Sequence, residues 1–178
     1  MSIGVSLGGG TGGQMQTKDG YLNQQARLLT AEANLRQNSE FAHAVAKDIE
    51  GRLKRLAMTL PDRPEVYFKD RNSEQEYDVR YHVGIARTFR SVLFRSFRYK
   101  LLQVHLHGNF KSVIARITAP EGHAFEQGLT LSSREQATEV FSQDYLAEIL
   151  KSQVVAANEA YVAWKAENSA MSLLRSRF

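Results

Sequence analysis

Residues 102–117 read LQVHLHGNFKSVIARI, and this stretch decides the fold class. Apolar residues at every second position from Leu102 to Leu106 alternate with Gln and His, a period typical of a half-buried strand. Gly108 and Asn109 follow as a two-residue turn signal, and a second apolar run comes directly after them. The stretch therefore predicts a β-hairpin with one polar face.

The sequence before this hairpin predicts more strands and a helix. The same alternation runs from Tyr77 to Val83, and Val66 to Phe68 is expected to add a further strand. Between them and the hairpin, apolar and basic residues fall on opposite sides of a helical wheel. The apolar side holds Ile85, Phe89, Val92, Leu93 and Phe97, and the basic side holds Arg87, Arg90, Arg95 and Arg98. We expect a small antiparallel sheet over about 65–117 that carries a basic amphipathic helix over about 85–100.

Long helices are expected on both sides of this region. An apolar stripe at spacings of three and four runs from Phe41 to Leu60, and Pro61 ends it. Ser132 and Glu135 form a capping box before a second apolar pattern. The sequence thus predicts an α+β protein with two long helices, over about 20–60 and 133–175, that flank the sheet and pair antiparallel. Helices this long exceed what one small domain covers, so other copies or proteins are expected to bury their ends.

The first 20 residues differ from the rest of the chain, because seven of them are glycine among Ser, Thr and Gln. We interpret 1–20 as a flexible Gly-rich arm and 21–178 as a single α+β domain. Gly8, Gly10 and Gly13 match a GxGxxG pattern, but a dinucleotide-binding fold needs a second parallel strand that the following sequence does not offer. The glycines are instead expected to contact neighbouring copies.

Charge is strongly segregated along the chain. Between Val79 and Pro120 lie eight of the 23 basic residues and none of the 19 acidic ones, although the whole chain is only +4. The eight residues are Arg80, Arg87, Arg90, Arg95, Arg98, Lys100, Lys111 and Arg116. Aromatic rings are interleaved with them, and we select Phe94 and Tyr99 as further contacts. Cations interleaved with stacking rings are typical of surfaces that bind nucleic acid, while an acidic neighbouring subunit is the competing partner.

No residues stand at a spacing that indicates catalysis or a metal site. His105 and His107 share a strand face, which His82 and His123 could approach, but we interpret them as polar-face residues rather than metal ligands. Paired carboxylates, a nucleophile beside a base and a strained serine turn are all missing as recognisable patterns. The sequence therefore predicts a protein that is not an enzyme, with no cofactor, no metal and no evident small-molecule substrate.

Composition limits the compartment. The chain has no cysteine, which excludes a disulfide framework and thiolate metal sites. No apolar run reaches the roughly 18 residues that a membrane-spanning helix needs, and no secretory signal is recognisable. We expect the protein in the cytoplasm or within a particle assembled there.

These features favour a non-enzymatic structural or adaptor subunit of a large assembly, such as a phage or virion-like particle, a filament or a transfer machine. Its basic surface would face nucleic acid or an acidic neighbour. The alternative is a sequence-tolerant nucleic-acid-binding protein that acts as a monomer or dimer. A homo-oligomer or a multi-protein complex is expected in the leading case. Its predicted contacts are Gly8, Gly10, Gly13, Tyr161, Trp164 and Phe178.

Overall fold

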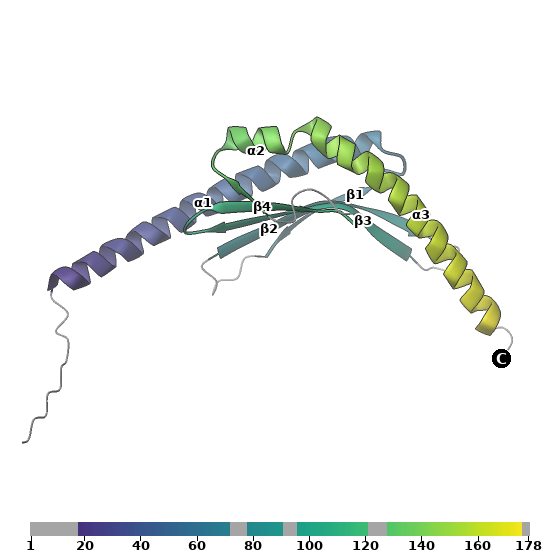
Figure 1. Cartoon of the computed structure of the whole chain (residues 1–178), viewed down its shortest axis with the longest axis horizontal. Coiled ribbons are helices and arrows are strands. Elements are labelled where there is room, and N and C mark those ends of the chain that lie inside the picture. The colour runs from purple at the N-terminus through teal and green to yellow at the C-terminus, as the bar shows by residue number, and fades with distance from the viewer. Residues whose placement is uncertain (1–17, 72–77, 91–95, 121–127, 176–178) are drawn as a thin grey trace, which may run out of the picture.

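The computed structural model describes residues 18–71, 78–90, 96–120 and 128–175, and the fold is α+β. One long helix precedes a five-stranded antiparallel sheet, and a bent helical segment follows it (Figure 1). The elements are α1 (Lys18–Thr59), β1 (Glu65–Asp70), β2 (Asp78–Arg90), β3 (Ser96–Asn109), β4 (Val113–Thr118), β5 (Leu129–Leu131), α2 (Arg134–Val140) and α3 (Gln143–Arg175).

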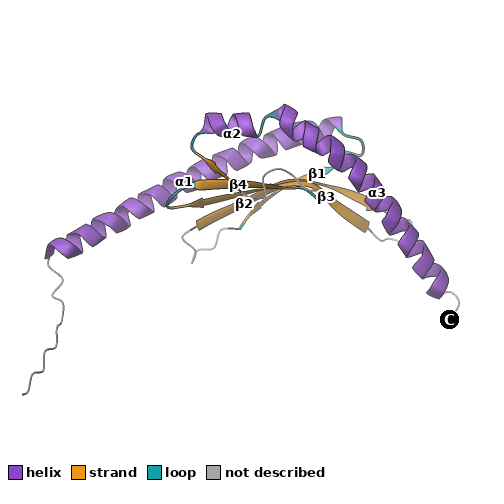
Figure 2. Ribbon diagram, viewed as in Figure 1, coloured by secondary structure: helices purple, strands orange, loops and turns teal. Residues whose placement is uncertain are grey.

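The sheet is a simple meander in which each strand pairs with the next along the chain, in the order β1-β2-β3-β4-β5. Val104 of β3 lies between Val83 of β2 and Ile117 of β4. The register between β2 and β3 shifts next to Ile85, where β3 has one extra residue and forms a β-bulge. All three helices lie on one side of this sheet (Figure 2).

The core lies between α1 and the covered face of the sheet. The apolar stripe of α1 is buried there, as predicted, with Ala42, Ile49 and Leu53 at most 1% exposed. The β-bulge places two successive side chains in this core, so Leu101 and Leu102 are both fully buried. The burial of this stripe confirms the first predicted helix. The N-terminal half of α1 continues beyond the sheet (Figure 1).

The predicted second long helix is interrupted. α2 ends at Val140, and α3 begins at Gln143, so Phe141 and Ser142 form a bend. The ring of Phe141 is 1% exposed, and its burial against α1 turns the chain at this point. α2 also starts one residue later than the predicted capping box implied, because the side chain of Ser133 accepts the hydrogen bond from the Gln136 N–H.

The predicted basic amphipathic helix over 85–100 is wrong. Residues 85–90 belong to β2 and 96–100 to β3, and the two segments pair with each other. The predicted positions Phe94 and Arg95 fall in 91–95, outside the described residues. The strand conformation is preferred over a helix because the backbone groups of both segments form hydrogen bonds between β2 and β3. In addition, Phe89 and Phe97 pack against rings of α3.

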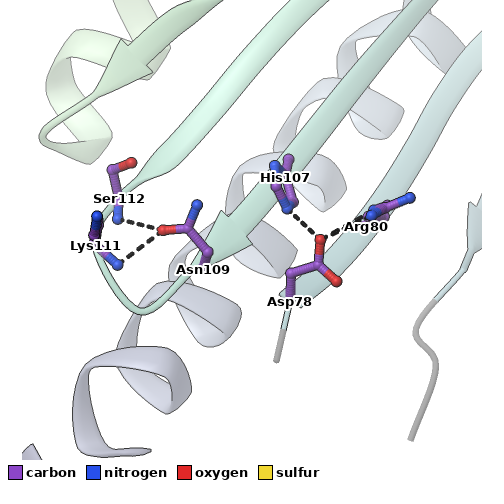
Figure 3. A network of polar contacts seen from close by, with 6 residues as sticks. All are labelled: Asp78, Arg80, His107, Asn109, Lys111 and Ser112. Carbon is purple, nitrogen blue, oxygen red and sulfur yellow. Dashed lines mark hydrogen bonds and ion pairs between the residues drawn. The ribbon is translucent and has the colours of Figure 1, made fainter. Parts of the chain in front are cut away.

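The predicted turn at Gly108-Asn109 is displaced. Gly108 is still paired with Val113, and the chain reverses over 109–112. The Asn109 side-chain oxygen accepts from the backbone N–H of Lys111 at 2.8 Å and of Ser112 at 3.0 Å (Figure 3). Gly108 serves packing instead, because a Cβ there would lie 3.0 Å from the Asn38 carbonyl oxygen of α1.

Several predicted positions lie outside the described residues. They are Gly8, Gly10, Gly13 and Phe178, together with most of the Gly-rich arm. The division into an arm and one domain therefore stays a prediction. Within the described ranges, no helix combines the length and apolar character needed to cross a membrane.

Candidate functional site

The sheet has one face covered by helices and one open face. Side chains alternate between these faces along each strand, so Val83 and Val104 point into the core while His82 and His105 point the other way. No helix in the described part of the chain packs on the open face (Figure 2). This face is the candidate functional site.

The open face is basic. Strand alternation and exposure place six cations on it, from four adjacent strands. They are Lys69, Arg80, Arg90, Arg98, Lys100 and Arg116. The described carboxylates on the same face are Glu65, whose oxygen lies 3.1 Å from the Arg98 guanidinium, and Asp78, which pairs with Arg80. The face therefore carries excess positive charge although the chain as a whole is nearly balanced.

A cavity of about 560 Å³ opens on this face, over the first residues of β2 and the last residues of β3. Its lining combines guanidinium groups, imidazoles and the apolar side chain of Ile114, and comes from β2, β3 and β4. The lining residues are Arg80, His82, His105, Leu106, His107, Ile114, Arg116 and Thr118. A group bound in the cavity would meet charged donors on both sides and imidazole nitrogens beneath it.

A hydrogen-bond chain fixes the imidazoles in this cavity. The Thr118 hydroxyl donates to the Gln103 carbonyl oxygen at 3.4 Å, so it accepts from His105 Nε2 at 3.2 Å. The Gln103 amide in turn donates to His82 Nδ1 at 3.4 Å. The His82 and His105 rings pack edge to face, with centroids 4.4 Å apart. Both imidazoles are held in place in their neutral forms.

Burial and positive neighbours keep these imidazoles uncharged. Burial lowers the pKa of His82 to about 4, and the charges of His105, Arg71, Lys69 and Arg80 act in the same direction. The pKa of His105 is also lowered, first by burial and then by Arg116. At neutral pH the positive charge of the face therefore comes from Lys and Arg, and the two imidazoles offer hydrogen bonds.

Asp78 holds the edge of the cavity together. Its Oδ2 accepts from Arg80 Nη2 at 3.0 Å and also contacts His107 Nε2 (Figure 3). Burial opposes ionisation of Asp78, but the hydrogen bonds from Arg80 and His107 outweigh it and lower the pKa of the carboxyl. The carboxylate stays ionised and fixes the direction of the Arg80 side chain.

A pH titration tests the environment of His82. Because its pKa is about 4 in the folded chain and 6.5 ordinarily, the unfolded chain binds more protons below pH 6.5. We expect the stability gained from neutral His82 to be complete above pH 6.5 and to be lost progressively as the pH falls toward 4.

The measurement is urea unfolding at several pH values. A His82→Gln variant should lose less stability than the parent between pH 6.5 and 4, and the two curves should run parallel above pH 7.5, where imidazole is neutral in both states. Equal acid sensitivity of variant and parent would show that His82 titrates normally.

Arg87 lies away from the open face. Its guanidinium is on the helix-covered side, 11% exposed, where it donates to the Asn158 side-chain oxygen at 2.7 Å and pairs with Asp62. It also lies over the Phe89 ring, 4.6 Å from the centroid. Arg87 therefore ties the loop between α1 and β1 to α3 and the sheet, and its charge is neutralised within the chain.

The remaining predicted residues fall in other places. Lys111 lies in the turn between β3 and β4. Tyr161 and Trp164 of α3 stack on aromatic rings of β2 and β3. The ring centroid of Tyr161 lies 4.4 Å from that of Phe89, and the centroid of Trp164 lies 5.6 Å from that of Phe97. Tyr99 adjoins the same cluster, 6.2 Å from Phe97. These rings pack against each other within the chain, on the covered side of the sheet.

The sequence reasoning missed two residues of the open face. Lys69 and Tyr67 lie on β1, and alternation with Phe68 places both opposite the core. The signal was present, because Val66 and Phe68 were already expected to form a strand with one apolar side. His82, His105 and His107 were correctly expected on a polar strand face, while His123 lies outside the described residues. Within the described ranges no cluster of three or more His, Asp or Glu is placed to hold a metal ion.

Comparison with known proteins adds no identification: no protein-family model matches this sequence, and no curated protein shows significant similarity to it.

Proposed function

We propose that this chain is a non-enzymatic, nucleic-acid-binding subunit of a larger assembly, whose open sheet face holds the sugar-phosphate backbone. One observation carries the proposal: six exposed cations and two carboxylates share that face, and two of the cations, Arg80 and Arg116, line a cavity of about 560 Å³. A face with this charge attracts polyanions and releases their counterions on binding.

The layout of the face favours a phosphate backbone over a compact anion. Same-face residues recur about every 6.6 Å along a strand and about 4.8 Å across strands. The first distance is close to the separation of successive phosphates in an extended single strand. The cations extend over β1 to β4 instead of converging on one point. Such a lattice binds a chain of phosphates without reading bases, and Tyr67 offers a ring beside Arg98.

The wider role as an assembly subunit has a separate support. α1 and α3 both extend beyond the sheet, in different directions (Figure 1). Tyr21, Leu22, Leu28 and Leu29 of α1 are more than half exposed, as are Val155 and Val162 of α3. Exposed apolar residues on projecting helices are typical of surfaces that contact other subunits. A monomeric or dimeric nucleic-acid binder remains the alternative.

The test neutralises part of the open face. A triple variant, Arg80→Gln, Lys100→Gln and Arg116→Gln, should bind a fluorescent single-stranded oligonucleotide at least about tenfold more weakly. Each lost phosphate contact removes about 0.7 from the slope of log affinity against log salt, so the slope should fall by about two. Fluorescence anisotropy between 50 and 300 mM salt, roughly the range in which counterion release is resolved, measures both quantities.

A matched triple variant controls for net charge. Lys54, Arg134 and Lys151 are exposed cations on the helices of the covered side, and their replacement by glutamine removes the same three charges. This control should retain most of the affinity and nearly the full salt slope. Equal loss in both variants would show that binding follows net charge and not this face, and the proposal would fail.

A further inference from the structure

The first part of α1 projects from the body as a helical extension, residues 18–37 (Figure 1). Its large apolar side chains are exposed, with Tyr21 at 55%, Leu28 at 58% and Leu29 at 66%. A helix of this length without tertiary contacts is only marginally stable in water. The extension therefore has both the surface and the need for a partner.

One side of the extension continues the core stripe of α1. Tyr21, Leu28 and Leu35 recur every seven residues, and the same spacing leads on to Ala42 and Ile49, which are buried against the sheet. A seven-residue spacing keeps side chains on one side of a helix. We call this side of the extension the seam; it is formed by Tyr21 and Leu28, which are exposed, and by Ala31 and Leu35, which are half-buried. It is the core-facing side of α1 at the place where the sheet no longer covers it.

We propose that a second copy of this chain covers the seam, with the two extensions packed antiparallel. From Asn38 onward the sheet packs against the seam side of α1. At this point the Asn38 side chain donates to the Asn109 carbonyl oxygen at 2.6 Å. A parallel second helix would continue into the space of that sheet. An antiparallel one ends before it, and its own sheet lies beyond the free end of the first extension.

Charge also favours a second copy on the extension rather than on the open face. The extension carries three basic and two acidic residues, a net charge of only +1, so two extensions repel each other only weakly. Two open sheet faces, each with excess positive charge, would repel. The inference deepens the assembly role proposed above, but it does not depend on nucleic-acid binding.

Sedimentation of the full chain, without nucleic acid, tests the seam. Leu28→Glu places a carboxylate in the seam of both copies, and the dimer dissociation constant should rise by at least about 100-fold. Leu29→Glu is the matched control, because Leu29 is equally long, more exposed and turned about 100° around the helix. This control should dimerise like the parent. Both variants should fold, since neither leucine is buried in the body.

Spin labels test the direction of pairing. The chain has no cysteine, so Gln37→Cys gives a single labelling site near the body end of the extension. In an antiparallel pair the two labels lie at opposite ends and more than about 20 Å apart, since a helix rises about 1.5 Å per residue. A parallel pair would bring them to about 10 Å, the distance between packed helices.

Each outcome decides the inference. A parent chain that stays monomeric at high micromolar concentration would overturn it, as would a dimer that Leu28→Glu leaves intact. A short distance between the labels would overturn the antiparallel arrangement. None of these results bears on the oligonucleotide affinity of the open face, which the triple variants measure separately.

Discussion

Replacing Phe141 by alanine is expected to lower the free energy of unfolding by about 3–5 kcal/mol, the range for deleting a fully buried aromatic ring. The Phe141 side chain is 1% exposed and lies between α1 and the bend that joins α2 to α3. Arg52 of α1 donates to the carbonyl oxygens of Thr138 at 2.9 Å and of Phe141 at 2.5 Å. The ring and these two hydrogen bonds hold both helical segments of the C-terminal part on α1.

Urea unfolding followed by circular dichroism measures this loss. Val140→Ala is the matched control, since Val140 is the neighbouring residue but only half-buried, and it should cost less than about 1.5 kcal/mol. Arg52→Met should cost about 1–3 kcal/mol, because it removes the donor of both hydrogen bonds and keeps most of the side-chain volume. A Phe141→Ala loss no larger than that of Val140→Ala would contradict the role given to the ring.

The failed helix prediction over 85–100 shows where sequence periodicity misleads. Ile85, Arg87 and Phe89 alternate onto the covered side of β2, so a period of two is present. This alternation is hard to recognise in the sequence because the middle residue is an arginine, a residue type that is usually expected to face solvent. Asp62 and Asn158 neutralise and bind it, and both are distant in the sequence. The β-bulge at Leu101 disturbs the alternation of the partner strand as well.

The long helix and the paired strands could be predicted because their signals are local. A stripe at spacings of three and four defines α1, and Pro61 stops it. The bend at Phe141 is different, because its local signal is weak: the Ser142 hydroxyl accepts from the Tyr145 N–H at 3.4 Å and caps α3, but one serine in a helical pattern does not by itself predict a break. It results from the fit of one ring against α1, and such tertiary packing overrides helix propensity.

The candidate site was half predictable from the sequence. Arg80, Lys100 and Arg116 stood out by charge segregation alone. Their common face follows from the register of β2, β3 and β4, which depends on where the turns and the bulge fall. The neutral state of His82 also required structure, because burial and the cations Lys69 of β1, Arg71 and Arg80 of β2 together lower its pKa.

Gly84→Ala is expected to destabilise the protein by about 3 kcal/mol and to weaken oligonucleotide binding at the open face. A Cβ at this position would lie 2.5 Å from the Tyr67 hydroxyl oxygen and 2.7 Å from the Leu102 carbonyl oxygen. The Tyr67 ring therefore lies on β2 only because residue 84 has no side chain. An added methyl group must move the ring or the backbone of β3, and either shift disturbs the floor between β1 and β3.

Gly51→Ala is the matched control, because it makes the same chemical change with the opposite expected sign. A Cβ at Gly51 meets only Arg55 Nη1, at 3.8 Å, and the exchange in the middle of α1 should stabilise the chain by about 0.5–1 kcal/mol. Combining Gly84→Ala with Tyr67→Ala removes the clash with the ring but not that with the Leu102 carbonyl. The double variant should therefore be less stable than Tyr67→Ala alone, because the clash with the Leu102 carbonyl remains. Thermal unfolding of the four variants gives these differences, and a Gly84→Ala chain as stable as the parent would show that β1 and β3 are not packed this closely on β2.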